Sequence, residues 1–314
     1  MKLPSLLTTP APSVAVEIGP RLVSGLAVAR HGSGSVITAH ASEPVPAGAL
    51  APALVGQNVA DRPAVARAVA GVLDRLAGHR RIALVLPDAV AKVSLVRLDH
   101  VPSNARDLDQ LVRWHVRKSA PFPLEEAQVT HSPGAPIPGG GREFVVAVAR
   151  REAVREYEGL CEEAGAHAGL VDLSTFSLVN AVVASARAAQ GDWLLVHLAA
   201  GAGSIAILRD GDLIFFRARG EGSEDGLADL VHQTAMYYED RLGGRGFARV
   251  LVAGSDGGPG GADAARREVD ARLGVRSETV DPRRIAQFSD RIDADAALVN
   301  MMAPLVGVLA GAGA

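Results

Sequence analysis

Three glycine-rich turns are the part of this sequence best suited to chemistry, because each follows an apolar run that predicts a β-strand. Their candidate binding residues are Glu17 and Gly19 in the first turn, His197, Gly201, Gly203 and Ser204 in the second, and Gly254, Ser255 and Gly257 in the third. Glycine lets a backbone approach an anion closely and adopt positive φ, so that the N–H groups of such a turn can bind phosphate. One such turn is common in proteins, whereas two at corresponding positions together with a third loop favour a nucleotide site.

Other catalytic and metal chemistry finds no support in the sequence. A Gly-x-Ser-x-Gly motif is absent, which argues against a serine hydrolase, and the nine histidines show neither HxH nor HxxxH spacing. Asp88 and Asp99 flank predicted strands and are interpreted as turn residues rather than as a kinase base. Cys161 shares a helix face with Tyr157 and Leu160, so we expect a small buried hydrophobe. The sequence therefore predicts no catalytic residue and no metal ligand.

Charge and hydropathy exclude two kinds of partner. The chain of 314 residues has a net charge of −3 and no long basic run, so nucleic acid is rejected as a ligand. The apolar run Met301–Ala314 is too short and too rich in glycine to span a bilayer, and the N-terminus lacks the apolar core of a signal peptide. A single cysteine suits a reducing cytosol. We expect a cytoplasmic chain with no direct membrane insertion, brought to a membrane only by a partner.

Two strand–turn–strand units position the first two turns. The predicted strands are Val14–Ile18 and Leu22–Val28 in the first unit, and Trp193–Leu198 and Ser204–Leu208 in the second. Val16-Glu17-Ile18-Gly19 and Val196-His197-Leu198-Ala199 occupy matching positions, and an amphipathic helix follows each unit. The repeat predicts two similar α/β halves whose hairpins face a shared cleft.

A third module separates the two units. Ile82–Glu126 reads as strand, turn, strand and one amphipathic helix, and it predicts a small α/β subdomain. Ser103-Asn104 can cap the helix and Pro121 ends it, because proline lacks an N–H group and disfavours helical geometry in the residue before it. The residues expected to face the subdomain's sheet are Leu108, Leu111, Val112 and His115.

These segments divide the chain into five parts. We expect a flexible leader at 1–12, the first part of an N-terminal lobe at 13–81, the inserted subdomain at 82–133, the remainder of the N-terminal lobe at 134–190, and a C-terminal lobe at 191–314. The boundaries follow the ends of the predicted strands and the loops that are rich in proline and glycine.

The end of the inserted module carries the most specific pattern in the chain. Its residues are Arg113, Trp114, Phe122, Pro123, Leu124, Glu125 and Glu126. They resemble the RWE…PFPLEE pattern of the PilM family of type IV pilus assembly proteins. The resemblance continues through Val145–Leu160 and Val171-Asp172 to Asp210-Gly211 and Met236–Glu239. It implies an α/β fold of the bilobed actin/Hsp70 type, with duplicated hairpin-containing halves and a small inserted α/β subdomain.

The resemblance also implies what the glycine-rich turns would hold. In the actin-like superfamily an aspartate at the end of each first strand holds Mg²⁺ or water beside the phosphates of ATP. Glu17 and His197 occupy these positions here, and Pro20 removes one N–H donor. Imidazole is mostly neutral near pH 7 and is a poor ligand for a hard cation. We expect a degenerate nucleotide cleft in which ATP binding is weak or absent, Mg²⁺ enters only with ATP, and hydrolysis does not occur.

The function that the resemblance implies is a cytoplasmic scaffold of a type IV pilus or related secretion platform, attached peripherally to the inner membrane through its partners. Such a scaffold would capture the N-terminal peptide of a PilN-like membrane protein and contact other platform components. The surface predicted to border the peptide groove comprises Arg113, Trp114, Phe122, Pro123 and Leu124. The alternatives are an active ATP-binding protein or ATPase of the same fold, a type II secretion component of the GspL type, and an FtsA-like filament protein.

Overall fold

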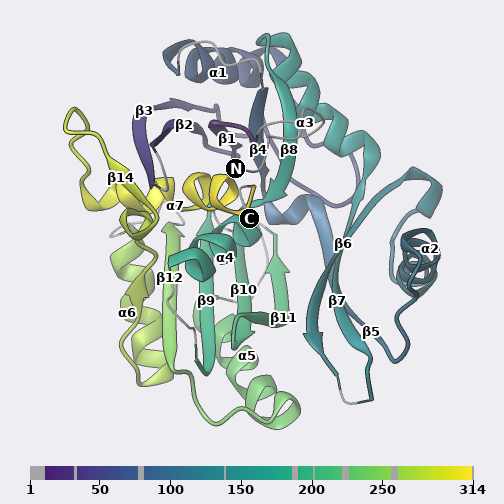
Figure 1. Cartoon of the computed structure of the whole chain (residues 1–314). Helices are drawn as coiled ribbons and strands as arrows, with labels where there is room; N and C mark the ends of the chain where they lie inside the picture. The colour runs from purple at the N-terminus through teal and green to yellow at the C-terminus, as the bar shows by residue number, and fades with distance from the viewer. Residues whose placement is uncertain are drawn as a thin grey trace, which may run out of the picture.

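The structure is a computed structural model of the whole chain, and it describes residues 11–31, 34–76, 81–137, 139–185, 190–200, 202–220, 226–255 and 261–312. The predicted leader, 1–12, lies outside these ranges apart from its last two residues. Two sheets form the centres of two lobes, and a third, smaller sheet stands beside them (Figure 1).

The two main sheets share one strand order. The first sheet contains β1 (Val14–Ile18), β2 (Leu22–His31), β3 (Gly34–Pro44), β4 (Arg81–Leu86), β8 (His167–Leu173) and β14 (Ala286–Phe288). The second contains β9 (Asp192–Ala199), β10 (Ala202–Arg209), β11 (Asp212–Arg219), β12 (Arg249–Ser255) and β13 (Glu278–Thr279). The order β3-β2-β1-β4-β8 in the first sheet corresponds to β11-β10-β9-β12-β13 in the second. The predicted duplication is therefore confirmed.

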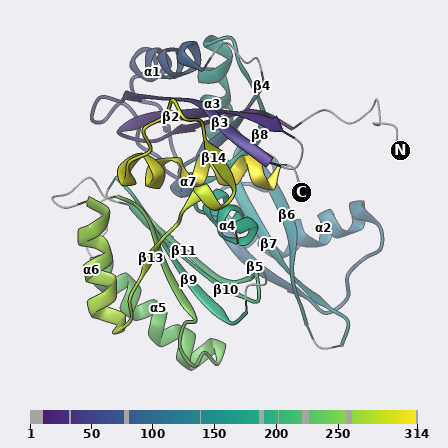
Figure 2. The same ribbon diagram turned by 60° about the vertical axis from the view of Figure 1, so that its left-hand side comes forward.

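Helices cover both faces of each main sheet. The six that do so are α1 (Arg62–Arg75), α3 (Arg151–Glu163), α4 (Ser174–Ser185), α5 (Leu227–Leu242), α6 (Gly261–Leu273) and α7 (Ala296–Gly311). Helices α1 and α3 lie on the outer face of the first sheet, α5 and α6 on the outer face of the second, and α4 and α7 between the lobes (Figures 1 and 2). The central strands are apolar along their length because both faces are covered. Within the described ranges, no helix is long and apolar enough to cross a bilayer.

The small sheet has the order β5-β7-β6 and carries one helix. Its elements are β5 (Ala91–Leu98), α2 (Ala105–Val116), β6 (Ala127–Pro136) and β7 (Arg142–Arg150). The predicted boundaries of the inserted subdomain, 82 and 133, are both wrong. Ile82–Leu86 lies in β4, which pairs in parallel with β1 and β8 of the first main sheet, and β7 pairs with β5 and β6 of the small sheet. The apolar run of β4 is buried on both faces, which is the property of a central parallel strand.

Helix α2 begins at the predicted cap and packs on the small sheet. The side chain of Asn104 accepts a hydrogen bond from the N–H of Arg106 at 3.0 Å. Val112 and Val116 are fully buried in the core of this subdomain, and Leu108 and Leu111 are partly buried there. His115, which was expected on this face, is exposed. Val116 takes its place because it lies four residues after Val112, one helical turn along the same face.

The helices between the lobes, α4 and α7, approach each other very closely. A Cβ atom built on Gly307 of α7 would lie 1.8 Å from the carbonyl oxygen of Ser177 in α4. Glycine at this position therefore lets the two backbones touch, and Ala303, Leu178 and Ala181 fill the space around the contact.

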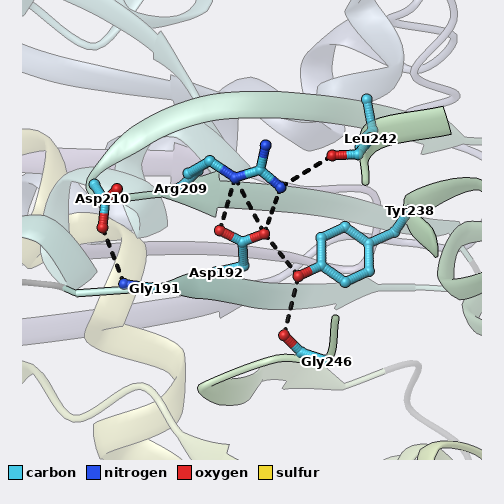
Figure 3. A network of polar contacts seen from close by, with 7 residues as sticks. All are labelled: Gly191, Asp192, Arg209, Asp210, Tyr238, Leu242 and Gly246. Carbon is cyan, nitrogen blue, oxygen red and sulfur yellow. Dashed lines mark hydrogen bonds and ion pairs between the residues drawn. The ribbon is translucent and has the colours of Figure 1, made fainter. Parts of the chain in front are cut away.

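A polar network fixes the outer end of the second lobe (Figure 3). The guanidinium of Arg209 donates to both carboxylate oxygens of Asp192, with a shortest distance of 2.6 Å, and its Nη2 also donates to the carbonyl of Leu242. The hydroxyl of Tyr238 lies 2.6 Å from Asp192 and 3.0 Å from the carbonyl oxygen of Gly246. The network thereby joins strands β9 and β10 to the C-terminal end of α5.

Candidate functional site

A cleft of about 830 Å³ lies between the two lobes. It is lined by five of the residues predicted from the glycine-rich turns: Glu17, Gly19, His197, Gly203 and Ser204. Of the third turn, Gly254 ends strand β12 and is not among the described residues that line the cleft. Gly201 and Gly257 lie outside the described residues, as does the placement of the Ser255 side chain. The structure thus brings the first two turns together.

The base of the cleft is a buried polar group of four side chains, which we call the interlobe cluster: Asp88, Thr175, His197 and Ser204. The hydroxyl groups of Thr175 and Ser204 both donate to Oδ2 of Asp88, at 2.5 and 2.7 Å. The backbone N–H of Thr175 donates to Oδ1 of the same carboxylate at 3.0 Å. Nδ1 of His197 lies 2.9 Å from Oγ1 of Thr175 and 3.5 Å from Oδ2 of Asp88. Asp88 and Thr175 belong to the first lobe and its exit into α4, whereas His197 and Ser204 belong to the second lobe.

The hydrogen-bond directions within the interlobe cluster follow from the number of hydrogens. Thr175 has one hydroxyl hydrogen, and Asp88 receives it, so Nδ1 of His197 must carry a hydrogen and donate it to Thr175. Burial raises the pKa of Asp88, but the nearby His197 and the hydroxyls of Ser204 and Thr175 together outweigh it, so the pKa lies below the ordinary value for an aspartate. The carboxylate of Asp88 is therefore held ionised and is already bonded on both oxygens.

Glu17 lies at the first-lobe side of the same cleft. The hydroxyl of Ser174 donates to Oε1 of Glu17 at 2.6 Å. Burial raises the pKa of Glu17 above the ordinary value for a glutamate, and the hydrogen bond from Ser174 only partly offsets this. A carboxyl group that resists ionisation is a weaker ligand for a cation.

Two described backbone donors of the predicted phosphate turns, at Gly19 and Gly254, are engaged within the protein. The N–H of Gly19 donates to the carbonyl of Leu22 at 3.0 Å, and Pro20 has no N–H group. Both backbone groups of Gly254 bond the side-chain amide of Asn300, each at 3.0 Å. Gly254 has φ +77°, a conformation that favours glycine. Gly254 therefore has glycine-dependent geometry, and the N–H groups of Gly19 and Gly254 are not available to a phosphate.

A second cavity, which we call the β8 groove, has a volume of about 640 Å³. Strand β8 forms one wall with Ala168–Leu173, and strands β6 and β7 of the small sheet form the other. Helix α3 supplies Val154, Arg155 and Glu158, and Phe176 of α4 closes one end. In the described part of the chain, β8 and β6 are edge strands of their sheets. Side chains bond two backbone groups of β8, the N–H of Leu173 through Asp172 and the carbonyl of Gly169 through Arg81. The groove therefore presents the edge of a strand beside an apolar surface.

The predicted partner surface lies away from the β8 groove. On the small sheet, Val146 and Val148 face α2, whereas Val145, Ala147 and Ala149 face the groove, as alternation along a strand requires. Helix α2 and the predicted residues on and after it therefore lie on the opposite face of this sheet (Figure 1).

Within that surface, Trp114 is the large hydrophobic side chain that is exposed. Trp114 is 68% exposed and packs edge-on against His115, while Arg113 pairs with Asp109 of the same helix at 2.7 Å. Phe122 and Leu124 are partly buried against the core of the small subdomain, and Pro123 is exposed. Their role as a partner surface stays a prediction.

Three residues in or directly beneath the cleft are not evident from the sequence. The sequence favours a turn residue at Asp88 and only a helix at Ser174 and Thr175. The partners of Asp88 lie 87 and 116 residues away along the chain, so no local spacing could reveal the interlobe cluster. The one available signal was the position of the Ser174-Thr175 pair at the start of a helix directly after a buried strand.

The fold and the cleft place this chain among proteins with an actin-like ATPase fold. A PilM–PilN type IV pilus biogenesis complex superposes with a TM-score of 0.82 at 18% identity, covering 96% of this chain and 98% of that one. A Bacteroides thetaiotaomicron protein with an actin-like ATPase fold superposes with a TM-score of 0.50 at 9% identity, covering 97% and 99%. The cytoplasmic domain of EpsL, an inner membrane component of the Vibrio cholerae type II secretion system, gives 0.47 at 11% identity, covering 76% and 80%.

The family is shown by the sequence itself. The profile of the family described as type IV pilus assembly protein PilM matches residues 15–242. The chain therefore belongs to the PilM family of type IV pilus assembly proteins. A comparison with curated proteins finds no match.

Proposed function

We propose that this chain is a scaffold of a type IV pilus assembly platform that recruits a PilN-like membrane partner. The partner's N-terminal segment would bind as an extended strand in the β8 groove. One observation carries this proposal: the groove combines the edge of β8 with an apolar surface and with charged groups at its rim. An extended peptide that adds to a sheet edge gains affinity from main-chain hydrogen bonds and specificity from side-chain pockets.

The dimensions of the groove suit a short segment. Strand β8 has seven residues, with a register shift near Gly169, so a peptide of a few residues could pair along the part between Leu170 and Asp172, because extended strands rise about 3.3 Å per residue. Val145 and Phe176 offer apolar contacts, and Arg155 and Glu158 offer partners for charged side chains. The similarity to the structure of a PilM–PilN type IV pilus biogenesis complex supports PilN-like chemistry for the partner.

The substitution Ala147→Arg tests this proposal. Ala147 lies on β7 and faces the groove, so a long charged side chain there would occupy the space of the peptide. We expect at least a thirtyfold loss of affinity, about 2 kcal/mol. The measurement is calorimetric titration of the purified protein with a synthetic peptide of the N-terminal segment of a PilN-like protein from the same organism.

Two controls locate the peptide. Ala271→Arg makes the same change on the exposed surface of α6 and should leave the affinity within twofold. Trp114→Ala removes the exposed aromatic of the α2 surface. If Trp114→Ala abolishes binding while Ala147→Arg does not, the peptide binds at the α2 surface instead. If the unaltered protein shows no binding, the recruitment proposal itself is wrong.

We also propose that the nucleotide cleft does not support ATP hydrolysis. The residues that would surround Mg²⁺ and a triphosphate fit these groups poorly. Glu17 resists ionisation, Asp88 already accepts three hydrogen bonds, and His197 stands where the second acid is expected. The turn at Gly19 and Pro20 also leaves few donors for a phosphate.

Phosphate release from ATP by the purified protein should accordingly equal that of a buffer blank. The double substitution Glu17→Asp and His197→Asp should increase Mg²⁺-dependent ATP binding, measured by calorimetry with and without Mg²⁺, because it supplies two oxygen ligands. A circular dichroism spectrum would establish that the variant is folded. Steady turnover by the unaltered protein would favour the alternative, an active ATPase of the same fold.

A further inference from the structure

One wall separates the interlobe cleft from the β8 groove. The 3₁₀ turn Asp88–Val90 forms part of it, with Asp88 facing the cleft and Val90 facing the groove. The junction of β8 and α4 forms the rest. There Leu173 faces the groove and Ser174 faces the cleft. The next residue, Thr175, is fully buried and lines neither cavity.

The interlobe cluster holds the two segments of this wall together. Thr175 bonds the carboxylate of Asp88 through both its N–H and its hydroxyl. Ser204 and His197 attach the same pair to the second lobe. Hydrogen bonds on the cleft side therefore fix the position of each wall segment. Any shift of a segment moves Val90 or Leu173 on the groove side.

We propose that Thr175 and Asp88 are positioning residues for peptide binding, and that the interlobe cluster sets the width and register of the β8 groove. This inference rests on the proposed function of the groove. It makes the state of the cleft and the affinity for the peptide interdependent, because any change that separates Asp88 from Thr175 moves residues on both sides of one wall. Coupling of this kind is reciprocal: a peptide that fits the groove also stabilises the interlobe cluster.

Hydrogen-bond chemistry explains why the hydroxyl of Thr175 is decisive. It is at once the acceptor for His197 and a donor to Asp88, so it links the first lobe to the second. Replacing threonine by valine keeps the shape and removes this link, leaving a buried carboxylate with one donor fewer. The wall would then relax toward whichever arrangement supplies Asp88 with another donor.

The test compares Thr175→Val, Thr175→Ser and Thr234→Val by titration with the same synthetic PilN-like peptide. We expect Thr175→Val to bind at least fivefold more weakly, although Thr175 lies outside the groove. Thr175→Ser retains the hydroxyl and should restore most of the affinity. Thr234→Val is the matched control: its hydroxyl is also buried, but it bonds Leu230 within α5, so the affinity should stay within twofold.

Hydrogen exchange of the protein without peptide gives a second readout. Thr175→Val should speed exchange of the amides of β8 and of Asp88–Val90, while Thr234→Val should not.

If the unaltered protein binds the peptide and Thr175→Val binds it equally well with unchanged exchange, the positioning role is wrong and the proposed function survives. If the unaltered protein binds no peptide, the proposed function fails, and exchange alone decides whether the cluster positions the wall. Equal weakening by Thr175→Ser and Thr175→Val would also overturn the inference, because the hydroxyl would then be irrelevant.

Discussion

The substitution Gly307→Ala should lower the free energy of unfolding by about 3 kcal/mol, the upper part of the range for overpacking a core. The added methyl group would meet the carbonyl oxygen of Ser177 at 1.8 Å, so helices α4 and α7 would have to separate. Alanine is favoured over glycine in a helix by about 1 kcal/mol, but this gain is smaller than the cost of the clash. Urea unfolding followed by circular dichroism measures the change.

Gly71→Ala in α1 provides the matched control for this substitution. Its new Cβ would meet only the flexible side chain of Glu43, at 3.2 Å. We expect a change in the free energy of unfolding of less than about 1 kcal/mol, since helix propensity favours alanine. Equal unfolding midpoints for Gly307→Ala and the unaltered protein would show that α4 and α7 are not in backbone contact.

The substitution Asp192→Ala should lower the free energy of unfolding by about 2–3 kcal/mol. It leaves the guanidinium of Arg209 and the hydroxyl of Tyr238 without their shared acceptor (Figure 3). Removing one partner of a buried ion pair costs about 3–5 kcal/mol. The side chain of Arg209 is 40% exposed, so water can solvate its charge and reduce this cost. Tyr238→Phe removes one bond only and should cost about 1 kcal/mol. Asp212→Ala, at the neighbouring strand end, should cost less than either.

The contribution of Asp192 should depend on pH in a defined direction. The hydrogen bonds from Arg209, offset in part by burial and reinforced by Tyr238, lower the pKa of Asp192 below its ordinary value. A carboxyl group whose pKa is lower in the folded protein binds fewer protons there, so it stabilises the fold above its unfolded pKa of about 3.9. The difference between the unaltered protein and Asp192→Ala should therefore be full at pH 7 and shrink as the pH falls below about 4. An unchanged difference at pH 3 would contradict this account.

The architecture could be predicted from the sequence because the architecture depends on local patterns. Two hairpins with apolar strands and glycine turns repeat at Glu17 and His197, and the structure confirms that they begin two sheets of the same order. The boundary at Ile82 was wrong for a reason of principle. A run of buried apolar residues predicts a strand, but only pairing with β1 and β8 decides which sheet it joins.

The functional surfaces were recovered less completely because they depend on distant residues. The hairpin residues of the cleft could be predicted. The role of Asp88 could not, because it depends on hydrogen bonds from Thr175 and Ser204, which lie far along the chain. The β8 groove is lined mainly by β6, β7, α3, β8 and α4, which follow one another along the chain. It exists because β8 joins the first main sheet whereas β6 and β7 join the small one, and strand pairing decides this rather than a local pattern. The helix-end pattern at Trp114 indicated the family, but it lies on the face of the small sheet opposite the groove.

The recessed edge of β8 also bears on aggregation. An uncovered edge strand is a template on which other chains can assemble, and proteins usually protect such edges with charge, proline or a bulge. In β8 the only acid or base besides His167 is Asp172, and the strand contains no proline. It does have a register irregularity near Gly169, and its surroundings add further protection, since α3 and the small sheet stand on either side of it. A single unfolded segment can enter such a recess, whereas the edge of a folded sheet cannot. The same walls would therefore admit a chain terminus and keep copies of this protein from joining edge to edge.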